Sequence, residues 1–90
     1  METIIIWDDK AARARECEIA ASQALKELGL KIPILVNSEA PLISRNQLWN
    51  RLPVLEIKGD HWSLKPGQAF TKQQLVKLFG KLFTPNPKNG

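Results

Sequence analysis

The chain has 90 residues, 43% of them hydrophobic, which is enough for one small core and too little for two domains. It contains a single cysteine, Cys17, and a single histidine, His61, so an intramolecular disulfide, a CxxC dithiol and a multi-cysteine metal site are excluded. The formal net charge is +4, but basic and acidic residues are interleaved. That balance favours solubility and does not indicate a particular partner.

The apolar runs of the sequence are short. Residues 4–7 and 32–36 fall far below the roughly 20 residues that span a bilayer, so we expect no membrane segment. The Met-Glu-Thr start lacks the basic and apolar regions of a secretory signal, which predicts a cytoplasmic protein with Cys17 as a free thiol. We expect no metal or other cofactor, because one thiol and one histidine are too few ligands.

The first half of the chain has the pattern of a strand followed by a helix. Residues 3–7 are β-branched and aromatic, which is typical of a central, parallel strand buried on both faces. Apolar residues then recur every three or four positions and predict a helix over residues 10–28. We expect Asp8 or Asp9 to cap the start of this helix and Gly29 to cap its end.

A second strand and a short helix follow. Residues 31–36 form the strand, and Pro33 predicts that it lies at a sheet edge, because proline lacks the amide hydrogen that a central strand needs. Residues 37–50 are the least periodic part of the chain and predict a loop followed by a short helix. We expect Trp49 to pack that helix onto the core.

The second half of the chain predicts a hairpin and a last helix. Residues 53–58 and 61–65 flank a tight turn at Gly59-Asp60. His61, next to that turn, is expected to be exposed. Further along, Thr71 and Gln74 fit a capping box at the start of an amphipathic helix.

The predicted order is β-α-β-(α)-β-β-α, which needs a mixed four-stranded sheet flanked by helices. This α/β arrangement is the thioredoxin-like one. A ferredoxin-like α+β sandwich is the alternative, but it needs a strand after the last helix, where Pro85 and Pro87 oppose one. We therefore predict one domain over residues 1–83 and a flexible tail over residues 84–90.

Four segments carry a resemblance to a known family: the Ile-rich opening strand, residues 24–30, residues 51–59 and the closing Thr-x-x-Gln-Leu helix. Over residues 2–83 the chain resembles the small single-domain thioredoxin-like proteins related to thioredoxin and glutaredoxin. The resemblance implies that Pro53 follows a cis peptide bond and faces the site where those proteins carry out redox chemistry. It also places the two CxxC positions on Ala11 and Ala14.

Neither of these positions carries sulfur in this chain. Dithiol exchange needs one thiolate that attacks and a second thiol that resolves the mixed disulfide, and alanine can do neither. Cys17 lies three residues beyond Ala14, on the same helical stripe as Ala21 and Ala24. We expect it to be buried in the core, although a monothiol role for Cys17 stays open.

Two tryptophans and a few basic residues are the other candidates for binding. Trp7 ends the first strand where the site loop begins, and Trp62 lies in the hairpin, so either could anchor a partner or cover a sheet edge. Lys10, Arg13 and Arg15 surround the start of the first helix, where backbone amides favour anions. Nearby acids make a solvated, salt-bridged face the simpler interpretation of these charges.

Our main hypothesis is a binding module with a degenerate active site and no catalytic residue. It would bind a peptide or protein partner in the groove between the first helix and Pro53, by backbone pairing with Leu52. Trp7 and Arg13 complete the predicted site. The alternative is a monothiol oxidoreductase acting through Cys17. A third class, nucleic-acid binding, would use Lys72, Lys77, Lys81 and Lys88, but no arginine-rich run accompanies them and a solvent-facing helix is the simpler interpretation.

Overall fold

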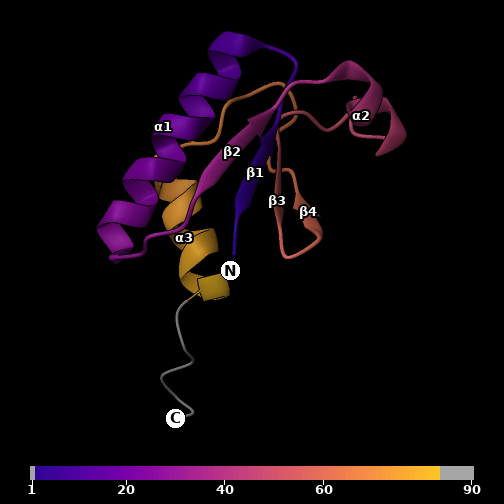
Figure 1. Cartoon of the computed structure of the whole chain (residues 1–90). Helices are drawn as coiled ribbons and strands as arrows, with labels where there is room; N and C mark the ends of the chain where they lie inside the picture. Colours follow the sequence, from indigo (N-terminus) through magenta and orange to yellow (C-terminus); the bar gives the residue numbers. More distant parts are fainter. Residues whose placement is uncertain (1, 84–90) are drawn as a thin grey trace.

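A computed structural model describes residues 2–83 of the chain (Figure 1). Its seven elements, in chain order, are β1 (Ile4–Trp7), α1 (Ala11–Leu28), β2 (Ile34–Asn37), α2 (Ala40–Arg45), β3 (Val54–Ile57), β4 (Asp60–Trp62) and α3 (Lys72–Phe83). The predicted tail over residues 84–90 lies outside the described residues. No helix within residues 2–83 is long and apolar enough to cross a membrane.

The four strands form one mixed sheet in the order β2-β1-β3-β4. β1 runs parallel to β2 and antiparallel to β3, and β3 runs antiparallel to β4. This is a thioredoxin-like topology, as the sequence predicted, and not the βαββαβ order of the ferredoxin-like alternative. β1 is central and β2 is an edge strand, also as predicted, although β1 has a parallel neighbour on one side only.

Two apolar clusters lie on opposite faces of the sheet. The larger one joins β1 and β3 to α1 and α3, which pack against the same face (Figure 1); its fully buried residues include Ile4, Cys17, Leu55, Leu75 and Phe79. The smaller cluster lies on the other face, near α2, and contains Trp7, Ile43, Leu48, Leu52 and Val54. The alternation of side chains along β1 and β3 supplies both clusters.

The ends of α1 differ in how well they were predicted. Gly29 caps the C-terminus with a left-handed φ of 71°, which a residue without a Cβ adopts readily. The prediction for the N-terminus was wrong: the N-cap residue is Lys10, which makes no side-chain cap. Asp8 instead binds the backbone of the N-cap residue itself, because its Oδ1 accepts a hydrogen bond from the Lys10 N–H at 3.1 Å.

The hairpin turn also differs from the prediction by one residue. Lys58 and Gly59 both have positive φ, 55° and 84°, so they are the two turn residues, and Asp60 is already in β4. A two-residue hairpin turn with both φ values positive matches the twist of its strands. The sequence suggested Gly59-Asp60 because aspartate is common in turns, but the position of Gly59 alone does not set the register.

The capping box of α3 is present as predicted. The Thr71 N–H donates to Gln74 Oε1 at 3.0 Å, and the Gln74 N–H donates to Thr71 Oγ1 at 3.2 Å. Lys72 at the start of α3 also forms an ion pair with Glu27 near the end of α1, at 2.7 Å. The two helices that cover one face of the sheet are therefore also joined at their ends.

Candidate functional site

The start of α1 is held by a buried carboxylate. Asp8 follows β1 directly and is fully buried. Its two oxygens accept hydrogen bonds from Arg13, Oδ2 from Nε and Oδ1 from Nη2, both at 2.7 Å. Arg13 also lies 3.5 Å from Asp9. This two-point pairing fixes the guanidinium against the loop that enters α1.

Asp8 also favours the charged form of Arg13. The hydrogen bond with Asp8 raises the pKa of the Arg13 guanidinium, against an opposing effect of burial. Arg13 is therefore charged at any physiological pH. The side chain is 20% exposed, so a small part of it faces solvent beside the helix start.

Ala11 and Ala14, the positions where the resemblance placed a CxxC pair, differ in exposure. Ala11, the first residue of the helix, is exposed, whereas Ala14 is buried. Cys17 is one turn further and fully buried, where its sulfur accepts the Phe70 N–H at 3.4 Å. Burial raises the pKa of the Cys17 thiol, so the neutral form predominates at neutral pH. The predicted burial of Cys17 is confirmed.

The peptide bond between Leu52 and Pro53 is cis, as the resemblance implied. Both residues are buried, and Leu52 packs in the same cluster as Trp7. The Leu52 carbonyl accepts a hydrogen bond from the Gly67 N–H at 2.8 Å. By contrast, the Leu52 N–H has no acceptor among residues 2–83. One of its two backbone groups is thus used by the chain itself, and the other is not.

Trp7 lies in the smaller apolar cluster, and its ring nitrogen forms a hydrogen bond with a residue of β3. Its side chain is mostly buried, and Nε1 donates to Glu56 Oε1 at 2.9 Å. His61 Nε2 lies 3.4 Å from the same oxygen and is buried, so the expectation of an exposed histidine was wrong. The register explains this, because His61 is the partner of Glu56 across β3 and β4.

The structure therefore groups three of the four predicted site residues and separates the fourth, Arg13, from them. Trp7 and Leu52 pack together, with Pro53 beside them, whereas Arg13 is engaged by Asp8 at the helix start. Trp49 was wrongly predicted to pack in the core: it is 44% exposed, with its ring nitrogen donating to Ser44 Oγ at 2.7 Å. Leu48, its neighbour, takes the buried position.

The sequence analysis missed two features of this region. One is the buried Asp8, whose position directly after a buried strand and five residues before Arg13 was a usable signal. The other is the contact of Gly67 with Leu52, for which only the Pro66-Gly67 turn gave a hint. Within residues 2–83 no three His, Cys, Asp or Glu side chains gather closely enough to hold a metal ion.

Comparison with protein families and with curated proteins found no relative of this chain. The chain matches no protein-family model and no curated protein, so its family is not assigned and the site rests on the fold and on the contacts described above.

Proposed function

We propose that this chain is a non-redox binding module of the thioredoxin-like type, related to small thioredoxin and glutaredoxin proteins, that holds an extended peptide or protein segment beside Leu52 and Pro53 in the cytoplasm. The observation that carries the proposal is the Leu52 N–H, a backbone donor without an acceptor in the described chain. Leu52 is only 4% exposed, and a buried backbone donor without an acceptor is uncommon in folded proteins. Such a donor suits an extended ligand.

The chemistry at the start of α1 supports binding over catalysis. Ala11 and Ala14 provide no sulfur at the positions where the family carries its dithiol. The one thiol of the chain, that of Cys17, is fully buried and has a raised pKa, so it lacks both access and thiolate character. No observation favours the monothiol alternative.

The same contacts shape how a segment would bind. The Leu52 carbonyl is already bonded to Gly67, so the ligand would accept from the Leu52 amide before it could donate in return. Trp7 would form part of the apolar floor, because it packs against Leu52. The exposed part of Arg13 would meet an acidic group of the ligand at the start of α1.

Selection from a random peptide display library tests the proposal. Peptides that bind the immobilised chain are synthesised, and their affinity is measured by fluorescence anisotropy. We expect binding to move the amide resonance of Leu52 downfield, since a new acceptor strengthens the polarisation of that N–H. Failure to recover any peptide, or binding that leaves the Leu52 amide unchanged, would contradict the proposal.

A blocking variant and a matched control sharpen the test. Ala11→Tyr fills the approach at the exposed first residue of α1 and should weaken binding at least about tenfold, a loss of about 1.4 kcal/mol. Gln23→Tyr adds the same ring at an exposed position three turns further along α1 and should bind as the wild type does. Equal binding by the two variants would place the ligand elsewhere.

A further inference from the structure

The outer edge of β2 has backbone groups that no other strand satisfies. The Pro33 carbonyl accepts the Ile4 N–H at 2.9 Å, and the Asn37 carbonyl accepts the Asp8 N–H at 3.2 Å. Since alternate residues of a strand turn their backbone groups to opposite sides, residues 33, 35 and 37 face β1. Ile34 and Val36 turn theirs away from the sheet, where none of the other strands within residues 2–83 lies.

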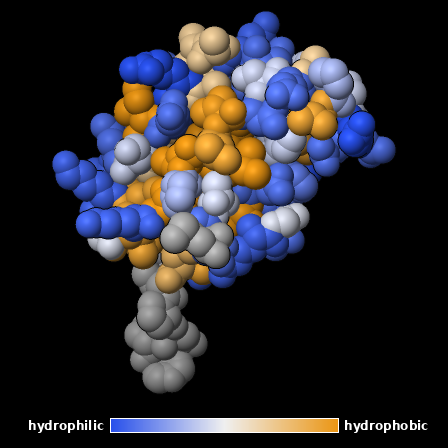
Figure 2. All heavy atoms as spheres, viewed as in Figure 1, coloured by the Kyte–Doolittle hydropathy of each residue, from blue (hydrophilic) through white to orange (hydrophobic). Residues whose placement is uncertain are grey.

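Two features that often protect an edge strand, an interrupting proline and charged side chains, are absent from the four residues of β2. Pro33 does not interrupt it, because the missing amide hydrogen is on the side that faces β1. No side chain of β2 is charged, and Leu35 and Val36 are 57% and 40% exposed. Figure 2 shows hydrophobic atoms gathered over β2 at the centre of the face in view. An uncharged, apolar edge is suited to pairing with another strand.

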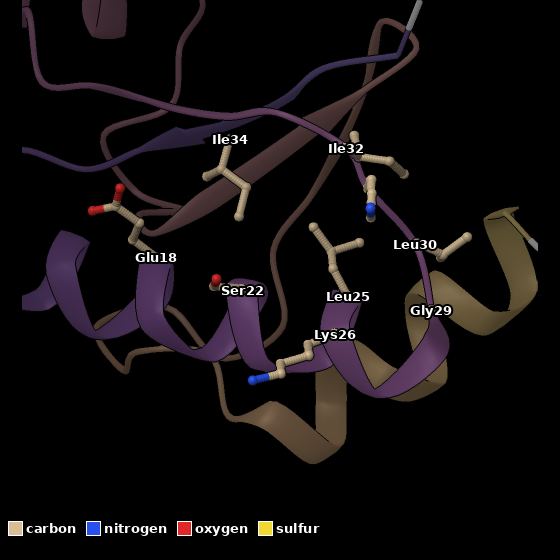
Figure 3. Close-up of a pocket in the computed structure, with 9 residues that line it drawn as sticks. Glu18, Ser22, Leu25, Lys26, Gly29, Leu30, Ile32 and Ile34 are labelled. Carbon is tan, nitrogen blue, oxygen red and sulfur yellow. The ribbon is translucent and has the colours of Figure 1, made fainter.

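A groove runs along the same edge, between β2 and α1. It has a volume of about 550 Å³. Ile34 points into it from the strand, and Leu25, Leu30 and Ile32 line its other end (Figure 3). A strand added next to β2 would place its side chains over this groove, so apolar burial would accompany the backbone hydrogen bonds.

The charges on the polar wall of the groove favour one kind of binding partner, a second copy of this chain. Glu18, Ser22 and Lys26 line it from α1 and follow one another at intervals of four residues, which is about one helical turn (Figure 3). If a two-fold axis passes near Ser22, the helix of a second copy runs antiparallel and brings its Lys26 to Glu18. This charge pattern is complementary to itself, a requirement of an isologous interface.

We propose that the outer edge of β2 pairs with the same edge of a second copy of this chain, forming a two-fold dimer with a continuous sheet. Ile34 lies opposite Ile34 of the second copy, and Ile32 lies opposite Val36 of the second copy. Antiparallel residues paired in this way exchange both N–H···O bonds. The proposal is independent of peptide binding beside Leu52, because the groove beside β2 is lined by none of Trp7, Arg13, Leu52 and Pro53.

Sedimentation velocity of the full chain, in a dilution series from micromolar to near millimolar, tests the dimer. We expect the wild type to shift from monomer to dimer with concentration. Val36→Pro removes one outward N–H at an edge position that tolerates proline, so it should stay monomeric while its circular dichroism remains that of the wild type. A monomeric wild type, or a proline variant that dimerises equally, would overturn the proposal.

A charge swap tests the register without altering the strand. Glu18→Lys should weaken dimerisation about tenfold at low salt, because it turns two attractions across the axis into repulsions. The double variant, Glu18→Lys with Lys26→Glu, should recover the wild-type dissociation constant to within about threefold. If the double variant dimerises no better than Glu18→Lys, the two helices do not face each other and the interface is a different one.

Discussion

The start of α1 and the outer edge of β2 lie on the same small domain but differ in how their polar groups are satisfied. At the start of α1, Asp8 binds both Arg13 and the Lys10 amide, so a charge and an orphan donor are satisfied within the chain. At the edge of β2, Ile34 and Val36 present backbone groups to the outside. The start of α1 is a closed region, because its polar groups are satisfied within the chain, and it contributes to stability. The outer edge of β2 is an open region, because its outward backbone groups have no partner strand, and it is available for association.

Two segments near the start of α1 are held by contacts from within the chain. The buried pair of Asp8 and Arg13 occupies the loop that leads into α1, where Ala11 carries no sulfur. The loop after β4 bonds to Leu52 through Gly67. Both segments are thus held by contacts within the chain, whereas the Leu52 amide has no acceptor among residues 2–83.

The largest effect should come from opening the closed region at Arg13. Arg13→Ala leaves the carboxylate of Asp8 fully buried without its counter-charge, and we expect a loss of about 2–3 kcal/mol in the free energy of unfolding. The lower end of the range for breaking buried pairs applies because Arg13 is partly exposed. Urea denaturation measures the loss.

Arg15→Ala is the matched control for that experiment. Arg15 is an exposed arginine on the same helix, and the structure gives it no ion pair among residues 2–83, so we expect a change within about 0.5 kcal/mol. If the two variants lose equal stability, the pairing of Arg13 with Asp8 is not what holds the helix start.

A smaller effect is expected at Gly67, the second contact of the closed region. Its φ of 86° lies in the left-handed region, and an added Cβ would meet nothing within 4 Å. Gly67→Ala therefore measures backbone strain alone and should cost about 1–2 kcal/mol. Gly80→Ala, in the middle of α3 and also without steric conflict, should instead stabilise the chain by about 0.5–1 kcal/mol. Opposite signs in thermal unfolding are the expected result.

The fold could be predicted because its signals are local. The Ile-rich run of β1, the spacing along α1, Gly29 and the capping box of Thr71 and Gln74 each depend on neighbours within one or two turns. The order of the predicted helices and strands is compatible with only a few topologies. The hairpin turn was displaced by one residue because its register depends on cross-strand pairing, which no local pattern shows.

The candidate site was harder to predict because its contacts are distant in sequence. Leu52 and Gly67 are joined across the hairpin, and Trp7 reaches Glu56 from another strand. Whether a side chain such as Arg13 is free or engaged depends on what tertiary packing places next to it. The sequence named the residues around the helix start but could not show which of their polar groups were already satisfied.

The buried thiol gives a prediction that depends on pH. Because the pKa of Cys17 is raised in the folded chain, its contribution to stability is present in full below the unfolded pKa, near 9, and is lost as the pH rises above it. We expect wild-type stability to fall more steeply than that of Cys17→Ala as the pH rises above about 9. Parallel pH profiles of urea midpoints check this.

Reactivity of the same thiol provides the control. A thiol reagent at neutral pH should react with Cys17 only after the chain is denatured, since the sulfur is fully buried in the folded state. Prompt reaction of the native chain would contradict both the burial of Cys17 and the proposal of a non-redox function.

The smallest effect on stability is expected at the open edge. Leu35→Thr removes much of the largest exposed apolar side chain of β2, yet below the concentration at which the chain associates it should change the free energy of unfolding by less than about 0.5 kcal/mol. Ile4→Val, which removes a single methyl from a fully buried position on β1, should cost about 1 kcal/mol. Loss of one methyl group in the core would then lower the free energy of unfolding more than the larger change at the edge. If Leu35→Thr costs more than Ile4→Val in dilute solution, the edge of β2 supports the monomer itself and the contrast between the two regions fails.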